Sequence, residues 1–344
     1  MDAPPIQYVR TRDSYNIAFN VGGNGPTLLM MPYPFTHARF SWTAPGLCES
    51  SVSLAQRFRV VHFDARGQGL SSRGLRDSHR MEDYLLDMDA VAEALKLDNF
   101  VLFSSVAFWR AAVAYAASNP RRVSALILLN PSWNPPAAQP PTPDTQAGAD
   151  WDTFLLMVGS TVSTVPSDTS ARFVLRDRMR ECIDPDDWRR MQAALHVSDP
   201  RPLLATISVP TLVLSQPGPW SSDGSEIAAA IPGAKLQLLE DYGNMLYSPT
   251  AEPPAGVTAI QEFLDSVAAP ESSRSPSRAA AGLSARQAEV LGLIAEGRSN
   301  KEIAAALVLS LRTVERHVAD LYTKLDIRNR AEATAFALNL PNRR

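Results

Sequence analysis

Residues suited to contact with a polyanion recur at helical spacing in the stretch 300–330. Apolar side chains at intervals of four and three residues predict a helix that buries one face, with Val314, Val318, Leu321 and Leu325. The opposite face carries groups that can contact base edges, at Arg312, Thr313, Glu315, Arg316, Ala319 and Asp320. Side chains that can pair with phosphates flank this helix, namely Lys301, His317, Lys324, Arg328 and Arg330. The pattern favours a DNA-reading helix and an ordinary charged helical bundle about equally.

Capping signals predict two shorter helices before this one. Ser284 can cap the first helix, and Gly297 is placed to end it. Ser299 or Asn300 begins the second helix, and Ser310 caps the third after a brief turn. Two helices joined in this way form the layout of a helix-turn-helix, in which the second helix of the pair enters the major groove.

The order of residues in 282–338 distinguishes between those two interpretations. Leu283-Ser284, Glu289-Val290-Leu291, Ser299-Asn300-Lys301-Glu302-Ile303-Ala304, Thr313-Val314 and His317-Val318 follow one another as in the LuxR/FixJ-type DNA-binding domain, which this segment resembles over its full length. The resemblance implies double-stranded promoter DNA as a partner, with Glu315, Arg316 and Ala319 facing the groove. The chain departs from the family at Glu315, where many members have lysine, and at Ala319, where a longer side chain is common.

Charge divides the chain in the same place. Residues 282–344 hold ten Lys or Arg and seven Asp or Glu, whereas the whole chain has a net charge of −3. Only this segment therefore suits a polyanion. The preceding residues, 268–281, mix Ser, Pro, Ala and Arg without apolar periodicity and are typical of a linker. We expect a large domain at 1–267, a linker at 268–281 and a DNA-binding domain at 282–344.

Composition narrows the class of protein. No stretch reaches the roughly 20 apolar residues that span a bilayer, and no apolar run follows Met1, so no membrane is expected as a partner. Two cysteines, Cys48 and Cys182, are too few for a disulfide framework, which favours a cytoplasmic protein with reduced thiols. Histidines and cysteines are scattered rather than grouped at ligand spacing, so neither a metal nor a cofactor is expected.

The large domain alternates short apolar runs with helical patterns, which predicts an α/β fold with a doubly wound, mostly parallel sheet. An opening hairpin is expected at 6–10 and 15–20, followed by buried strands at 27–31, 59–63, 100–103, 123–129, 211–215 and 235–239. Helices are expected near 47–56, 81–96, 107–118, 224–231 and 255–267. The interval 131–205 breaks this alternation and is interpreted as an inserted helical cap, with helices at 151–157, 171–180 and 186–196.

Several strings within 1–267 resemble the α/β-hydrolases. Residues 64–71, DARGQGLS, match the family's D-x-R-G-x-G-x-S turn after a strand, and 112–128 match the helix and strand that follow its nucleophile. Residues 209–214 and 231–234 match a later strand and helix end. The resemblance implies that fold for nearly the whole of 1–267.

The same alignment places residues without triad chemistry at all three catalytic positions. Val106 stands where the nucleophile of G-x-S-x-G belongs, Pro219 stands at the acid, and Asn244 at the base. A valine has no nucleophilic atom, and its branched Cβ resists the positive φ of the elbow. Ser105 in a shifted register would still lack an imidazole in the final loop, and Pro32-Tyr33 replaces His-Gly in the oxyanion segment. No catalytic residue is therefore assigned.

A cavity between cap and sheet remains possible without catalysis. Candidate apolar walls are Tyr33, Phe35, Trp42, Val106, Trp109, Trp151, Phe154, Trp188, Trp220 and Met245, and candidate polar contacts are Ser105, His37, Tyr33 and Asn244. About half of these are expected to be ordinary core packing. Such walls suit a small, mostly apolar or aromatic molecule rather than a phosphate or sugar acid.

The hypothesis that combines these observations is a one-component transcription regulator with a catalytically inactive sensor domain. It would act as a homodimer on DNA, with RNA polymerase as a possible further partner. Two alternatives remain open: an active esterase or lactone hydrolase joined to a DNA-binding domain, and a ligand-free regulator whose large domain serves dimerisation or protein docking. A phosphorylated response regulator is disfavoured, because the large domain does not resemble a receiver.

Overall fold

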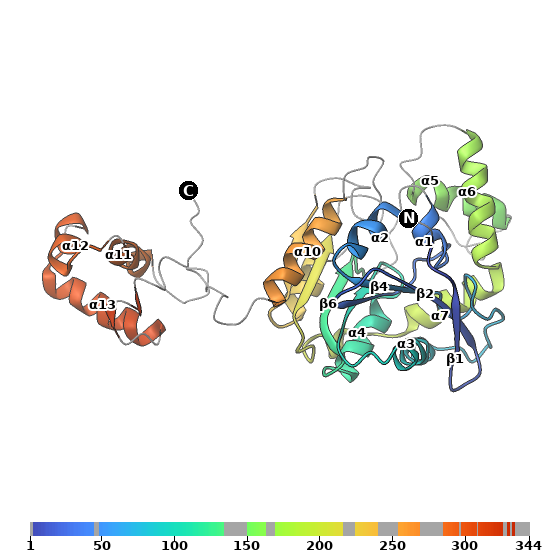
Figure 1. The fold of residues 1–344 in the computed structure, drawn as a ribbon, viewed down its shortest axis with the longest axis horizontal. Coiled ribbons are helices and arrows are strands. Elements are labelled where there is room, and N and C mark those ends of the chain that lie inside the picture. Colours follow the sequence, from blue (N-terminus) through green and yellow to red (C-terminus); the bar gives the residue numbers. More distant parts are fainter. Residues whose placement is uncertain are drawn as a thin grey trace. The chain divides into compact units, whose positions relative to one another are not determined.

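The computed structural model describes residues 3–44, 48–133, 150–162, 169–215, 224–239, 254–268, 285–295, 297–307, 309–325, 329–330 and 332–333. The chain forms two compact units, Met1–Leu264 and Asp265–Arg344 (Figure 1). Within the described ranges, no helix has both the length and the apolar character needed to cross a membrane.

The described residues of the first unit form one mixed sheet of eight strands in the order β1-β2-β4-β3-β5-β6-β7-β8. The strands are β1 Gln7–Arg10, β2 Asn16–Gly22, β3 Thr27–Met30, β4 Arg59–Phe63, β5 Phe100–Ser104, β6 Val123–Leu129, β7 Thr211–Ser215 and β8 Lys235–Leu238. β2 is antiparallel to both β1 and β4, and the pairs from β4 to β8 are parallel. The predicted hairpin and the positions of the six predicted strands are confirmed, but β8 is largely exposed rather than buried, because it is an edge strand of the sheet.

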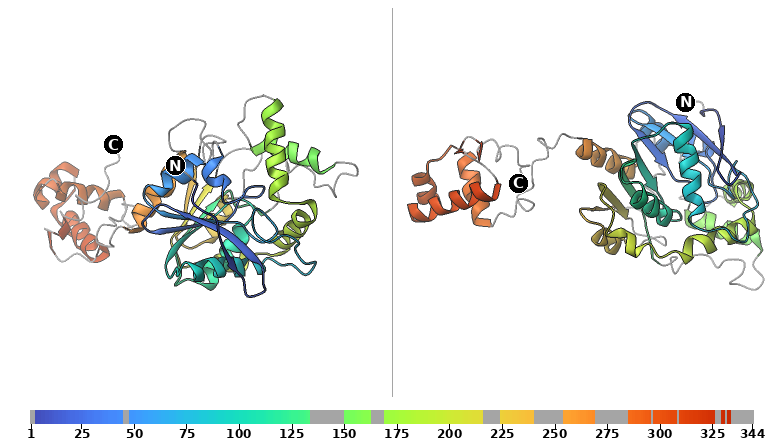
Figure 2. Two further views of the ribbon diagram at one scale, coloured as in Figure 1. Left: turned by 45° about the vertical axis from the view of Figure 1, so that its right-hand side comes forward. Right: turned by 90° about the horizontal axis from the view of Figure 1, so that it is seen from below.

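Helices cover both faces of this sheet, as in a doubly wound fold. They are α2 Cys48–Ala55, α3 Asp83–Ala94, α4 Trp109–Ser118, α9 Gly224–Ala230 and α10 Ala255–Ala268, with the short α1 Phe40–Thr43 and α8 Arg201–Leu204. α2 and α10 lie on one face, and α3 and α4 lie on the other (Figures 1 and 2). The five longer helices are as predicted, whereas α1 and α8 are too short to show a periodic pattern.

The cap follows β6 and consists of α5 Trp151–Val162, α6 Thr169–Cys182 and α7 Pro185–Val197. α5 runs five residues beyond the predicted end at Met157. α7 begins as its sequence requires, because the Asp184 side chain accepts a hydrogen bond from the Asp187 amide and proline occupies the first turn. α5 and α6 pack against each other.

A buried polar network fixes the turn after β4. The two carboxylate oxygens of Asp64 accept hydrogen bonds from the amides of Ala38, at 2.7 Å, and Leu70, at 2.8 Å. Gly69 has φ +59, and a Cβ there would lie 2.3 Å from the Asp64 carboxyl carbon, so glycine is required. Arg66 pairs with buried Asp87 and with Asp13. This network joins the loop after β3 to the turn after β4 and so supports the rim of the site.

The described part of the second unit contains α11 Ala285–Ala295, α12 Asn300–Leu307 and α13 Leu311–Leu325. Ser299 and Glu302 form the reciprocal capping box of α12, and Ser310 Oγ accepts a hydrogen bond from the Thr313 amide to cap α13. Gly297, at φ +80, ends α11. These three boundaries are confirmed, and Ser284 lies outside the described residues.

Candidate functional site

The turn between β5 and α4 is where the hydrolase resemblance places a nucleophile. Val106 is half-buried at this turn, and Ser105 beside it is 1% exposed. Among described non-glycine residues, positive φ occurs at Ser14, Phe35, Lys96 and Asn130, and so at neither Ser105 nor Val106. The backbone therefore lacks the strained conformation that a branched side chain resists. Ser105 Oγ has no hydrogen-bond partner among the described residues.

The loop after β3 forms the next wall. The Tyr33 ring lies 6.3 Å from that of Phe103, and its buried hydroxyl lacks a partner among the described residues. Burial raises the pKa of Tyr33 well above its ordinary value, so the phenol stays protonated and can donate. Phe35 adopts φ +61, which is unfavourable for a bulky side chain and aims its ring at the cap.

The structure brings four of the predicted wall residues together in what we call the aromatic cluster: Phe35, Trp151, Phe154 and Trp188. The Phe35 ring centroid lies 4.4 Å from that of Trp188 and 6.4 Å from that of Trp151, and Trp151 stacks on Phe154 at 5.1 Å. The indole Nε1 atoms of Trp151 and Trp188 are buried and have no partner among the described residues. The cluster joins the loop after β3 to α5 and α7.

Two other predicted wall residues, Trp42 and Trp109, lie in separate surroundings. Trp42 donates from Nε1 to Asn20 Oδ1 at 3.0 Å, and its ring fills the space where a Cβ of Gly22 would stand, so it packs on β2. Trp109 is fully buried, with its ring centroid 5.3 Å from that of Trp133. The two indoles therefore belong to the packing around β2 and α4 and make no ring contact with the aromatic cluster.

His37 stacks on Phe40 with ring centroids 3.7 Å apart. Burial, with Arg39 and Arg73 nearby, lowers the pKa of His37 to about 4, so the ring is neutral at pH 7. Pro219, Trp220, Asn244 and Met245 lie outside the described residues. The roles predicted for those four residues therefore stay predictions from the sequence.

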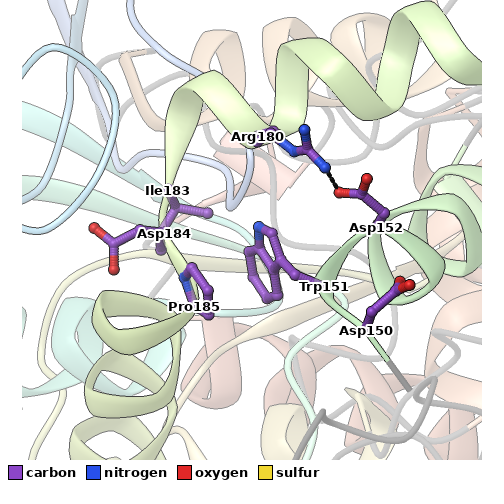
Figure 3. Close-up of a pocket in the computed structure, with 7 residues that line it drawn as sticks. All are labelled: Asp150, Trp151, Asp152, Arg180, Ile183, Asp184 and Pro185. Carbon is purple, nitrogen blue, oxygen red and sulfur yellow. Dashed lines mark ion pairs between the residues drawn. The ribbon is translucent and has the colours of Figure 1, made fainter. Parts of the chain in front are cut away.

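Two cavities border these residues. A small one of about 20 Å³, between Tyr33, Thr36, Ser51 and His62, has room for a single water molecule. A larger one of about 470 Å³ lies in the cap, and we call it the cap cavity (Figure 3). Its lining comes from the start of α5, the end of α6 and the start of α7, namely Asp150, Trp151, Asp152, Arg180, Ile183, Asp184 and Pro185.

Sequence reasoning identified only Trp151 among the residues of the cap cavity. Asp150 and Asp184 resemble ordinary helix caps in the sequence, and they do serve as caps: Asp150 Oδ1 accepts from the Thr153 amide at 2.7 Å, and Asp184 Oδ1 from the Asp187 amide at 2.8 Å. Asp152 forms an ion pair with Arg180. The sequence marks Asp150 and Asp184 as helix caps beside Trp151 and Pro185, but it gives no indication that these residues border the same space.

The base of the cap is tied to the loop that follows β4. Asp187, 1% exposed, accepts hydrogen bonds from the amides of Gly74 at 2.8 Å and Leu75 at 2.6 Å. The Gly69 amide donates to the Cys182 carbonyl at 2.6 Å. These contacts hold α7 and the end of α6 in place. Asp152, near the start of α5, is linked instead to the α6 residues Arg180 and Arg176.

In the second unit, α13 presents the predicted polar face. Arg312, Glu315, Arg316 and Ala319 are exposed, while Val314 and Leu321 are buried. Thr313 and His317 are half-buried, and Thr313 Oγ1 lies 2.8 Å from Oγ of Ser310, the residue that caps the N-terminus of α13. Lys301, on α12, is exposed.

Two predicted phosphate contacts make bonds within the unit. Lys324 Nζ donates to Gln287 Oε1 at 3.1 Å, and Arg330 donates to Asn300 Oδ1 at 3.1 Å and to the Arg298 carbonyl. By contrast, Lys301, Arg312 and Arg316 form no ion pair or side-chain hydrogen bond with the described part of the chain. The cations available for an external anion are thus concentrated at α12 and the exposed face of α13.

Comparisons with known proteins agree with this architecture. Residues 281–337 match the family of bacterial regulatory proteins named luxR, and residues 44–174 match the α/β hydrolase fold. A 56-residue segment is 50% identical to the uncharacterized transcriptional regulatory protein YhcZ of Bacillus subtilis, covering 16% of this chain and 26% of that protein. A 55-residue segment is 42% identical to the transcriptional regulatory protein LiaR of the same organism, again covering 16% and 26%. The chain thus spans about a quarter of the length of these relatives.

Two solved structures with hydrolase names resemble the first unit of this chain. A hydrolase from Pseudomonas aeruginosa superposes with a TM-score of 0.63 at 23% identity, over 75% of this chain and 98% of that one. The enol-lactonase from Burkholderia xenovorans gives 0.60 at 20% identity, over 75% and 100%. Identities this low establish the fold alone. The chain therefore carries a helix-turn-helix domain of the luxR family of bacterial regulatory proteins after a domain with the α/β-hydrolase fold.

Proposed function

We propose that this protein is a one-component transcription regulator. Its hydrolase-fold domain senses a small, mostly apolar or aromatic molecule without hydrolysing it, and its luxR-type domain binds promoter DNA. The observation that carries the proposal is the pairing of a DNA-reading helix with a hydrolase fold that has Val106 at its nucleophile position. Such a combination keeps the binding surface of an enzyme and connects it to a different output.

The DNA-binding role is supported by the surface of α13. Arg316 and Arg312 are exposed on the face opposite Val314 and Leu321, and Lys301 is exposed on the preceding helix. In a helix-turn-helix this arrangement lets the arginines reach base edges while the lysine pairs with a phosphate. Two copies would place two such helices on half-sites about one helical turn apart, and RNA polymerase would be contacted from the bound dimer.

The absence of hydrolysis is supported by the surroundings of Val106. The turn has no nucleophilic atom at that residue and no positive φ, and Ser105 Oγ makes no hydrogen bond to a histidine or to any other described residue. His37 is stacked on Phe40, and His62 is bound to Ser51 Oγ at 3.0 Å inside the domain. An imidazole held this way does not activate a serine at the turn.

Sensing requires that the ligand bind two conformations of the domain unequally. α7 is poorly suited to move, because Asp187 and the end of α6 are bonded to the loop after β4. α5 is better suited to move, because its contacts are ring packing and ion pairs rather than buried hydrogen bonds to the backbone of the sheet domain. Trp151 and Phe154 pack against Phe35 in the loop after β3, and Asp152 forms ion pairs with α6. We place the ligand-responsive movement at α5.

Two assays test the proposal on the full chain. Selection from a random DNA library should return a defined, two-fold symmetric sequence, and esters of p-nitrophenol should show no turnover above an unrelated control protein. Turnover that disappears in Ser105→Ala would instead support an active esterase, the alternative favoured by the unpartnered Ser105 hydroxyl. Recovery of no preferred sequence would refute the regulator.

A further inference from the structure

Glu315 is an exposed acid on α13, the proposed DNA-reading helix. It is the fifth residue of that helix, which packs against both α11 and α12 (Figure 1). Val314 and Leu321 are buried in this packing, whereas the Glu315 side chain is exposed to solvent. In a helix-turn-helix, residues in the N-terminal part of the second helix contact base edges in the major groove. Glu315 therefore lies in the part of α13 that meets the bases.

No contact with the described part of the chain accounts for Glu315. A glutamate in a helix is supported by a cation three or four residues further along, but the residues there are Val318 and Ala319. Glu315 forms no ion pair or side-chain hydrogen bond with the described residues, including Arg312 one turn earlier. It also follows the first turn of α13, beyond which the attraction of the helix dipole for a carboxylate falls off. A role in folding therefore does not explain this carboxylate.

A carboxylate in the major groove is unfavourable unless a hydrogen-bond donor meets it. The phosphates carry charge of the same sign, and closure of the interface removes water from the carboxylate. Guanine and thymine present acceptors at the groove edge, which repel a carboxylate, whereas cytosine presents its N4 amino group as a donor. Adenine also has an amino group, at N6, but the N7 acceptor lies beside it. Cytosine is therefore the base that a glutamate favours most.

The neighbours of Glu315 on α13 suit such a contact. Ala319 is exposed one turn further along, and its small side chain lets the base edges approach the helix closely. Arg312 and Arg316 are exposed and form no ion pair with the described part of the chain, so both guanidinium groups can pair with nearby phosphates or with guanine. The two arginines thereby offset the repulsion from the phosphates, while the Glu315 carboxylate keeps its acceptors for a base.

We propose that Glu315 accepts a hydrogen bond from the N4 amino group of a cytosine in each half-site and so determines the base preference at that position. This inference rests on the proposed regulator function and specifies part of the DNA sequence that the regulator recognises. Glu315 acts mainly by exclusion, because guanine or thymine at the same position leaves the carboxylate desolvated against an acceptor. The preference therefore depends on the charge and the acceptor oxygens of this one side chain.

Parallel selections from a random DNA library test this inference on the full-length protein. The wild type should select a cytosine in each half-site that Glu315→Ala no longer selects. In Glu315→Gln the same position should change to adenine, because an amide offers a donor to adenine N7 and an acceptor to adenine N6. Glu289→Gln is the matched control: it removes an exposed acid of the same unit, on α11 and so outside the pair α12 and α13, and should leave every base preference unchanged.

Fluorescence anisotropy with four duplexes that differ only at this base pair measures the size of the effect. The wild type should bind the cytosine duplex at least about tenfold more tightly than the guanine or thymine duplex, which is within the range for a good contact to a base edge. Glu315→Ala should reduce this ratio to less than about threefold. The change should come mainly from tighter binding of the guanine and thymine duplexes, because the repulsion of their acceptors is removed.

Three results would overturn the inference: the same base preferences in the wild type and Glu315→Ala, a base other than cytosine at the position that responds to this substitution, or equal affinity of the wild type for the four duplexes. Identical and specific preferences in both proteins would remove the role of Glu315 while leaving the proposed regulator intact. Recovery of no preferred sequence from the wild type would instead refute the regulator, and this inference with it.

Discussion

Replacement of Asp187 by alanine should loosen the cap from the sheet domain. The carboxylate is buried and accepts amide hydrogen bonds from Gly74 and Leu75. Leu75 is buried, so its amide would lose its acceptor without gaining water, at about 1–3 kcal/mol. Gly74 is exposed and its amide can turn to solvent, which limits that loss to about 1 kcal/mol.

A compensating effect opposes these losses. Burial, with repulsion from Asp184, raises the pKa of Asp187, so removal of the charge relieves part of the desolvation. We expect the free energy of unfolding to fall by about 2–3 kcal/mol overall. Asp187→Asn keeps one acceptor oxygen and should lose less than half as much. The exposed Asp186→Ala should lose much less than Asp187→Ala, because its partner Arg189 is also exposed.

Urea unfolding followed by tryptophan fluorescence measures these changes in the relevant domain, because all six tryptophans precede residue 221. Limited proteolysis should also cleave the cap of Asp187→Ala sooner than that of the wild type. Equal stability of Asp187→Ala and the wild type, or an equal loss in Asp186→Ala, would refute the role assigned to these hydrogen bonds.

Three further predictions concern pH, DNA and hydrolysis. Burial lowers the pKa of His62 to about 4, whereas an unfolded histidine titrates near 6.5, so the neutral ring contributes about 3 kcal/mol to the free energy of unfolding above pH 6.5 and loses it as pH falls toward 4. His62→Gln should therefore flatten the pH dependence of urea unfolding between pH 6.5 and 4, and a slope identical to that of the wild type would contradict this. Lys301→Ala should weaken binding to all DNA sequences in electrophoretic shift assays, whereas Arg316→Ala should also relax the preference at one base pair by about 1–3 kcal/mol. If both variants keep full affinity for the specific sequence, α13 is not the helix that enters the major groove. Wild type and Ser105→Ala should have the same background rate on p-nitrophenyl esters, and a faster wild type would show a working nucleophile.

Local patterns in the sequence were sufficient to predict the elements. The buried runs of β3 to β7 are continuous because parallel strands are covered on both faces, so their positions could be read without tertiary information. The capping residues Ser299 and Ser310 act within one turn of their helices, and both are found as predicted. Val106 could likewise be placed at the turn after β5 from the order of residues alone.

What the sequence left open were the contacts between residues far apart in the chain. Trp42 and Trp151 look alike as apolar candidates, yet one packs beneath Gly22 on β2 and the other joins Phe35 and Trp188, because only the path of the backbone decides which surfaces meet. Arg330 and Lys324 resemble phosphate contacts until the fold brings Asn300 and Gln287 within reach.

The cap cavity shows the same division most clearly. Asp150 and Asp184 are separated by two helices in the chain, and each has a complete local explanation as a helix cap. Local patterning therefore predicts nothing further for them. The two residues border one space with Trp151 because α5 packs on α6 and α7 follows directly, which no local pattern in the sequence specifies.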